Sequence, residues 1–155
     1  MGGVTATPPK TNSTPPLPST SSRPFLRWQG SKRRVARSIS ALLASPRGTY
    51  VEPFLGGGSV FFEVRPNAAF LCDSLEPLVG TYIAVRNDPQ GVSAHLAAIA
   101  SSSCTYYDVR KHMSSLQLGT PEHAGAFIYL NAHCFNVTIH VAGLRRPEAA
   151  STGRR

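Results

Sequence analysis

The sequence predicts an α/β fold, and three observations predict it. A short β-prone run over residues 49–55 leads directly into three consecutive glycines, Gly56 to Gly58. Residues 59–64 can then open a helix, and a second apolar run over residues 68–72 ends in Asp73, 17 positions after the first glycine. Strand, glycine loop, helix and a second strand with a terminal carboxylate form the usual layout of a nucleotide-binding unit, in which that carboxylate follows by roughly 20 positions.

Composition limits the chain to one domain and leaves its partners open. With 155 residues, of which 41% are hydrophobic, the chain is long enough for a single core. The 16 lysines and arginines exceed the 8 acidic residues, giving a net charge of +8, and they gather near the front and at the end. Such an excess favours a polyanionic partner, but a solvated basic surface explains it equally well.

Cysteine usage and hydropathy indicate an intracellular protein. The three cysteines are far apart and form no C-x-x-C pair, so they suggest neither a disulfide framework nor a thiolate zinc site. No apolar run approaches the roughly 18 residues of a membrane span, and the N-terminus lacks the apolar stretch of a secretory signal. We therefore expect a soluble, cytoplasmic chain.

The first expected elements are a leader and a helix. Residues 1–23 are rich in Pro, Ser and Thr and are predicted to be disordered, because they cannot bury enough apolar surface. Apolar residues then recur at helical spacing from Val35 to Leu43, and Pro46-Arg47-Gly48 ends the pattern. Ser31 is the expected N-cap of this helix. Beyond the second strand, further helices are predicted over residues 77–87, 91–101, 106–116 and 121–133.

The glycine loop does not match two other nucleotide-binding motifs. A Walker loop requires Gly-Lys-Ser/Thr, and no glycine here precedes a lysine. A dinucleotide fingerprint counted from Gly56 would place its last glycine at Phe61, whose ring would push the helix away from the strand. A ligand that contains an adenosine but no phosphates remains compatible with the loop. S-adenosylmethionine is such a ligand.

Four segments in this order carry a family resemblance: Phe25-Leu26-Arg27-Trp28-Gln29-Gly30-Ser31-Lys32; Tyr50-Val51-Glu52-Pro53-Phe54-Leu55-Gly56-Gly57-Gly58-Ser59-Val60-Phe61-Phe62; Tyr106-Tyr107-x-x-Arg110; and Phe127-Ile128-Tyr129-Leu130-Asn131 with Cys134-Phe135-Asn136. In sequence and order they resemble the Dam-type DNA adenine-N6 methyltransferases, over roughly residues 24–136. The resemblance implies an α/β, Rossmann-like, S-adenosylmethionine-dependent methyltransferase fold and methylation of adenine in duplex DNA, without a metal.

The resemblance also implies roles for individual residues. Trp28 and Lys32 match the front motif that helps to form the cofactor pocket, where Lys32 is expected to meet the methionine carboxylate. Asp73 matches the acidic residue that holds the ribose. Further cofactor contacts are expected from the loop residues Glu52, Pro53, Phe54, Gly56, Gly57 and Gly58. Residues 24–100 would form the N-terminal half of the cofactor domain, and residues 101–136 the start of a helical target-recognition region that includes the DNA-binding Asn131 and Asn136.

Each of these residues also has a purely structural interpretation. Trp28 could equally well be an aromatic residue of the core. Without the family resemblance, Lys32 would be interpreted as one of three consecutive solvated basic residues. Asp73 could be the N-cap of the next helix, in addition to binding a ligand. The five histidines form no metal-binding pattern, and surface or helix positions are expected for them.

One motif of the family is missing from these 155 residues. The family accepts hydrogen bonds from the flipped adenine with an Asp-Pro-Pro-Tyr loop, and only Asp88-Pro89-Gln90, far too early in the chain, resembles it. Family pattern also stops after Asn136, so residues 137–155 are interpreted as a basic tail. We expect an incomplete enzyme without its own catalytic residues, whose partners are duplex DNA and a complementary C-terminal fragment. The alternative is a non-catalytic remnant that binds cofactor or DNA weakly.

Overall fold

The computed structural model describes residues 23–43 and 48–134. Within these ranges the chain is a mixture of helices with one small parallel sheet. Residues 1–22 of the predicted leader, the end of the first helical pattern at Pro46, Asn136 and the basic tail lie outside the described residues.

The predicted strand–loop–helix–strand unit is confirmed. Strand β1 (Tyr50–Glu52) leads through the glycines into helix α2 (Ser59–Val64) and then into strand β2 (Ala69–Leu71). The two strands pair in parallel, with Val51 opposite Phe70. Because the strands are parallel, the loop after β1 and the residues after β2 meet at one edge of the sheet, where the candidate site lies.

Helix α1 (Arg33–Leu42) packs against α2, and its start differs from the prediction. Lys32, not Ser31, occupies the N-cap position, and no side chain caps the helix. The Ser31 hydroxyl lies 2.7 Å from that of Ser59 at the beginning of α2. The predicted N-cap at Ser31 is therefore wrong. Its hydroxyl bonds to Ser59, which is distant in the sequence, and not to a backbone amide of α1.

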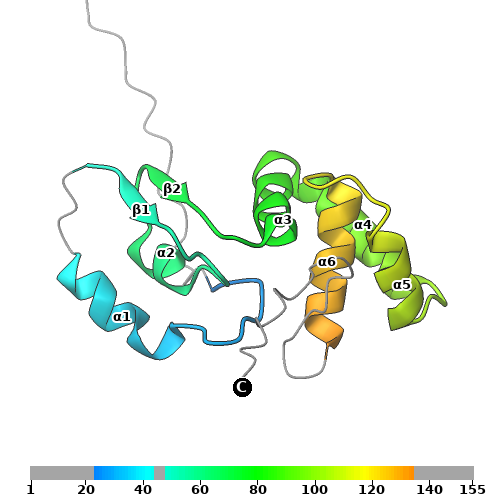
Figure 1. Ribbon diagram of the computed structural model, residues 1–155, viewed down its shortest axis with the longest axis horizontal. Coiled ribbons are helices and arrows are strands. Elements are labelled where there is room, and N and C mark those ends of the chain that lie inside the picture. The colour runs from blue at the N-terminus through cyan, green and yellow to red at the C-terminus, as the bar shows by residue number, and fades with distance from the viewer. Residues whose placement is uncertain (1–22, 44–47, 135–155) are drawn as a thin grey trace, which may run out of the picture.

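Four helices form the second part of the fold: α3 (Glu76–Asn87), α4 (Pro89–Ser101), α5 (Tyr106–Met113) and α6 (Pro121–His133). Figure 1 shows them together on one side of the molecule, with the sheet, α1 and α2 on the other. Helix α6 contacts the other three, so it is the centre of this group. Three of the starts are favoured locally by a proline in the first turn of the helix.

The hydrophobic core lies where α6 meets α3 and α5. Phe127 and Leu130 of α6 and Leu78 of α3 are fully buried there, and Val109 of α5 is buried beside them. Leu26 enters the same cluster from residues 24–32, the front segment, which in Figure 1 runs between the sheet side and the helical side. The front segment therefore contributes a buried residue to the core of the helical side.

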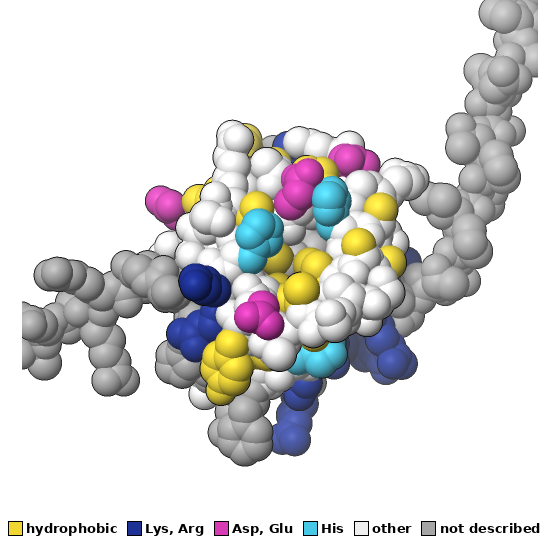
Figure 2. Space-filling model, turned by 90° about the vertical axis from the view of Figure 1, so that its right-hand side faces the viewer, with side chains coloured by type: hydrophobic (Ala, Val, Ile, Leu, Met, Phe, Trp, Pro, Cys, Tyr) yellow, Lys and Arg dark blue, Asp and Glu magenta, His cyan; other side chains and the backbone are white. Residues whose placement is uncertain are grey.

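The face formed by the last three helices has a hollow of its own. Figure 2 shows apolar side chains at its floor, with histidines and acidic residues around it. The floor is formed by Ile99, Val109, Leu116 and Ala126. At the rim, His95 Nε2 lies 3.2 Å from a carboxylate oxygen of Glu122, which links α4 to α6. Across the described part of the chain, no helix combines the length and the apolar character needed to cross a membrane.

Candidate functional site

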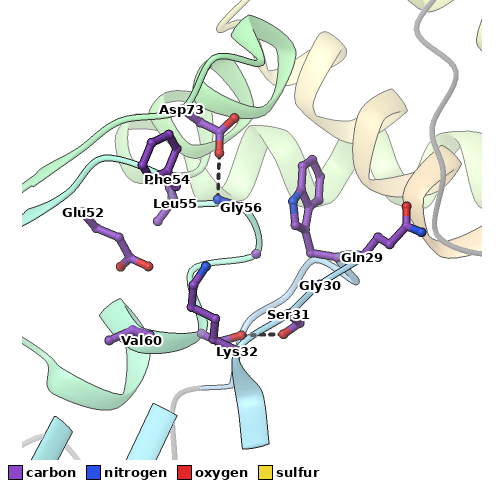
Figure 3. Close-up of a pocket in the computed structure, with 13 residues that line it drawn as sticks. Gln29, Gly30, Ser31, Lys32, Glu52, Phe54, Leu55, Gly56, Val60 and Asp73 are labelled. Carbon is purple, nitrogen blue, oxygen red and sulfur yellow. Dashed lines mark hydrogen bonds between the residues drawn. The ribbon is translucent and has the colours of Figure 1, made fainter. Parts of the chain in front are cut away.

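A polar cleft lies between the glycine loop and the front segment. Figure 3 shows its walls: Gln29 to Lys32 on one side, and the end of β1, the loop and the start of α2 on the other. Seven of the predicted cofactor residues line it: Trp28, Lys32, Glu52, Phe54, Gly56, Gly57 and Asp73. Pro53 and Gly58 do not. The fold thus brings together residues that are up to 45 positions apart in the sequence.

The glycines let the backbone approach the Trp28 indole. Gly56 has φ +50°, a left-handed conformation, and a Cβ there would lie 2.7 Å from Trp28 Cδ1. A Cβ on Gly57 would lie 3.0 Å from Trp28 Cβ and 3.3 Å from the Leu26 carbonyl oxygen. The 2.7 Å distance at Gly56 is shorter than any that a real Cβ atom adopts, so the loop can follow this path only if that position has no side chain.

Asp73 is tied to the glycine loop. One of its carboxylate oxygens accepts a hydrogen bond from the Gly56 amide at 2.8 Å, and the other accepts from the Leu75 amide at 3.1 Å. Leu75, not Asp73, is at the N-cap of α3, so the alternative of Asp73 as a helix cap is wrong. Each oxygen keeps a further lone pair, so the carboxylate can still accept two hydroxyl hydrogen bonds from a ligand.

Glu52 is buried and supports the start of α2. Its Oε2 accepts hydrogen bonds from the Tyr50 hydroxyl at 2.9 Å and from the Phe61 amide at 3.1 Å. Phe61 is the third residue of a helix whose N-cap, Gly58, has no side chain, so Glu52 satisfies an amide that a cap normally would. Burial and the Glu52 carboxylate together raise the pKa of the Tyr50 hydroxyl well above its usual value.

Gly58 has a structural function behind the cleft. Its φ is +67°, and a Cβ there would lie 3.0 Å from the Tyr82 hydroxyl and 3.1 Å from the Phe62 ring. Tyr82 packs against Phe25 and Phe62 with its hydroxyl buried and without a hydrogen-bond partner. Burial, followed by the charges of Glu52 and Asp73, raises the pKa of this hydroxyl far above its usual value. The third glycine therefore shapes the loop and does not contact the cleft.

Lys32 and Phe54 present free groups to the cleft. Figure 3 shows the Lys32 side chain extending into the space between the two walls. Among the described residues, no carboxylate forms an ion pair with its amine. Phe54 is 79% exposed, so its ring is available for contact with an apolar or aromatic group of a ligand.

The arrangement can bind a ligand with a diol and a carboxylate. Asp73 supplies hydrogen-bond acceptors, Lys32 supplies an ammonium group, and Gly56 and Gly57 let a ligand reach the backbone. Among the described residues that line the cleft, Lys32 is the only basic one, and a single ammonium group suits one carboxylate better than a run of phosphates. In residues 23–43 and 48–134, no group of three or more His, Cys, Asp or Glu side chains is arranged to hold a metal ion.

Asn131 lies in the interior, not on a surface that could face DNA. Its side chain is 2% exposed, and both of its polar ends bond to the Arg27 backbone. A DNA contact by this amide would require both bonds to break. The predicted DNA-binding role of Asn131 therefore has no support in this arrangement, and Asn136 lies outside the described residues.

The structure adds residues that the site prediction did not include. Gln29, Gly30 and Ser31 line the cleft from the front segment, Leu55 lines it just before the glycines, and Ser59 and Val60 line it from α2. All six belong to the two motifs that carried the family resemblance, but only their conformation shows that they face the same space. The described residues that line the hollow on the α4–α6 face include no glycine loop and no lysine, so it is a weaker candidate for the same ligand.

A comparison with protein families identifies one match. The sequence profile described as D12 class N6 adenine-specific DNA methyltransferase matches residues 28–144. This range contains the glycine loop, Asp73 and all four of the helices on the second side of the fold. It begins at Trp28, the residue against which the loop glycines pack.

Three curated proteins illustrate the similarity. The Type II methyltransferase M1.LlaDCHI of Lactococcus lactis subsp. cremoris is 35% identical over 68 residues, covering 44% of this chain and 24% of that protein. The DNA adenine methylase of Haemophilus influenzae is 26% identical over 123 residues, covering 77% and 43%. That of Escherichia coli K12 is 31% identical over 119 residues, covering 74% and 42%. The chain thus spans less than half the length of these relatives.

Proposed function

This chain belongs to the D12 class N6 adenine-specific DNA methyltransferase family, and on that premise we propose that its glycine-loop cleft binds S-adenosylmethionine. The observation that carries the proposal is the joint placement of Asp73, Lys32 and the glycines around one cleft. This donor set fits the ligand, which has a ribose diol, a carboxylate and no phosphate. When bound, the cofactor would supply the methyl group for transfer.

Each wall of the cleft has a proposed task. The free lone pairs of the Asp73 carboxylate accept the ribose hydroxyls, while its existing bond to Gly56 keeps the loop close. Lys32 binds the methionine carboxylate. Phe54 and the Trp28 indole provide apolar contact area, and Glu52 contributes by holding the start of α2. Pro53 and Gly58 set the path of the loop without contacting the ligand.

The architecture and the reaction are proposed on the same basis. We assign a Rossmann-like methyltransferase arrangement, with residues 24–100 as part of the cofactor domain and residues 101–136 as the start of the target-recognition region. The reaction proposed for the complete enzyme is methylation of adenine N6 in duplex DNA. The curated relatives named above as DNA adenine methylases, and the net charge of +8, support DNA as the partner.

Isothermal titration calorimetry with S-adenosylmethionine tests the cofactor. Lys32→Met removes the ammonium group without touching a backbone hydrogen bond, and we expect the dissociation constant to rise about tenfold, as for loss of one ion pair with a ligand carboxylate. Lys111→Met, at an exposed position on α5, is the matched control and should bind as the wild type does. A folded wild-type chain that gives no binding heat, or equal losses in both variants, would overturn the proposal.

Binding of DNA is tested separately by fluorescence anisotropy with a labelled duplex. The affinity should fall steeply as the salt concentration increases, because contacts to phosphates release counterions. Binding that is absent at low salt, or that does not change with salt, would contradict DNA as the partner of these residues.

A further inference from the structure

The Asn131 side chain joins the helical side of the fold to the front segment. Asn131 lies near the end of α6, and Arg27 lies 104 positions earlier in the chain. The Arg27 amide donates to Asn131 Oδ1 at 2.8 Å, and Asn131 Nδ2 donates to the Arg27 carbonyl oxygen at 2.8 Å. One side chain thus satisfies both backbone groups of one residue, as the neighbouring strand of a sheet would.

This pair of bonds is protected from water. Asn131 is nearly fully buried, and its neighbour Leu130 packs with Leu26 in the main core cluster. In such surroundings a hydrogen bond is stronger than in water, and a broken one leaves a costly unpaired group. The Arg27 guanidinium also reaches the Ala132 carbonyl oxygen at 3.4 Å, but this contact is long and exposed. The Asn131 amide is therefore the main polar link between α6 and the front segment.

Trp28 directly follows Arg27, whose backbone is bonded to Asn131, and Trp28 forms part of one wall of the cleft. A Cβ on Gly56 would lie 2.7 Å from the Trp28 indole, and one on Gly57 would lie 3.0 Å from the Trp28 Cβ, so the position of Trp28 and the loop conformation depend on each other. A shift of the Arg27 backbone would move the Trp28 ring against or away from the loop. The path from Asn131 to the glycine loop consists of two hydrogen bonds, one peptide unit and one packed ring.

We propose that Asn131 is a positioning residue for the cofactor cleft: it holds Trp28 against the glycine loop and so couples α6 to ligand binding. The inference deepens the proposed function, on which it rests for the identity of the ligand. Coupling of this kind is reciprocal, so a ligand in the cleft also stabilises the contact between α6 and the front segment. An ordinary buried core amide would contribute to stability without affecting the cleft.

The chain offers a direct probe, because Trp28 is its only tryptophan. Acrylamide quenching of its fluorescence reports how well the ring is held, even without a ligand. Asn131→Ala removes both bonds, and Asn131→Asp is the conservative variant, which keeps an acceptor for the Arg27 amide but loses the donor. Val92→Ala, in the separate cluster formed by α3, α4 and α6, is the control for a general loss of stability.

The measurements use the full chain below the lowest melting temperature of the set. In both Asn131 variants we expect the quenching constant of the free protein to rise about twofold, because a released ring samples solvent. The dissociation constant for S-adenosylmethionine should rise about tenfold, since the ligand must then order the wall itself. Val92→Ala should melt earlier but match the wild type in both measurements. If Asn131→Ala does not fold, Asn131→Asp provides the same comparison.

Two results would overturn the inference: folded Asn131 variants with wild-type quenching, or equal changes in Val92→Ala. If quenching changes as expected but no variant, including the wild type, binds S-adenosylmethionine, the positioning role stands and the proposed cofactor fails. If affinity falls in the Asn131 variants while quenching stays at the wild-type value, Trp28 is not the link and the inference is also overturned.

Discussion

The carboxylate of Asp73, just after β2, accepts a hydrogen bond from the Gly56 amide, in the loop after β1, at 2.8 Å. The acidic residue therefore holds the glycine loop in its conformation before any ligand arrives. Because Gly56 also packs on Trp28, this bond connects the second strand to the wall formed by the front segment. Ligand binding and loop stability consequently depend on the same side chain.

The first prediction concerns that shared side chain. Asp73→Ala should lower the free energy of unfolding by about 1–3 kcal/mol, because the Gly56 and Leu75 amides lose a charged acceptor. It should also weaken binding of S-adenosylmethionine, as measured by calorimetry alongside urea unfolding. Asp88→Ala is the control, since Asp88 likewise accepts a backbone bond, from Gly91 at 2.8 Å, but caps α4 far from the cleft. Asp88→Ala should reduce stability by about 1 kcal/mol and leave the affinity unchanged.

The second prediction separates backbone strain from contact with Trp28. Gly56 and Gly119 both have positive φ, but a Cβ on Gly119 meets nothing within 4 Å. Gly119→Ala should therefore cost only about 1–2 kcal/mol of left-handed strain. Gly56→Ala should cost a further ~1–3 kcal/mol, because the new methyl group overlaps the Trp28 ring. Equal melting temperatures for the two variants would show that the loop does not pack on Trp28 as described.

The third prediction is a pH dependence caused by a buried histidine. His123 on α6 is 1% exposed, its Nδ1 has no hydrogen-bond partner, and burial lowers its pKa. The unfolded chain, with a histidine pKa of about 6.5, then takes up the proton first as the pH falls. The contribution of neutral, buried His123 to the free energy of unfolding is therefore complete above a pH of about 6.5 and is lost progressively below it.

Urea unfolding between pH 7.5 and pH 5 measures this loss. His123→Leu should remove most of the dependence in this range, while His112→Gln, at an exposed position, should retain it. An unchanged slope in His123→Leu would assign the pH dependence to other groups.

The fourth prediction concerns the start of α5. Thr105 and Asp108 form a reciprocal capping box, in which each side chain bonds to the backbone amide of the other residue. The Thr105 hydroxyl also donates to the Asp108 carboxylate at 2.7 Å and, with the backbone bond, lowers the pKa of that carboxyl group. Thr105→Ala should lower the melting temperature by roughly 5 °C, and Thr105→Ser should restore most of it. A circular dichroism melt of Thr105→Ala that matches the wild type would contradict a role for this cap.

Local patterns were sufficient to predict most of the elements. The order strand, glycine loop, helix, strand follows from β-prone runs, three glycines and helical spacing, and α6 has the predicted bounds. The family resemblance read from the motifs is confirmed by the profile match. These predictions succeed because secondary structure and glycine conformation depend mainly on residues close together in the chain.

Predictions that depended on distant partners were less successful. Ser31 was expected to cap α1 and instead meets Ser59. Asp73 was given a helix-capping alternative, but Leu75 is the N-cap of α3, and the Asp73 carboxylate accepts bonds from the Gly56 and Leu75 amides. In both cases the local pattern identified a polar side chain that needs a partner, but it could not show which partner the fold would bring near.

The sequence by itself determined the family, the β-α-β unit and seven of the residues that line the cleft. Only the tertiary structure decided that the glycines make room for Trp28 and that Asn131 holds the backbone beside it. The physical reason is the separation along the chain: Trp28 and Gly56 are 28 positions apart, and Arg27 and Asn131 are 104 positions apart. Contacts of this range follow from how buried surfaces and unpaired polar groups are satisfied together, which no local spacing records.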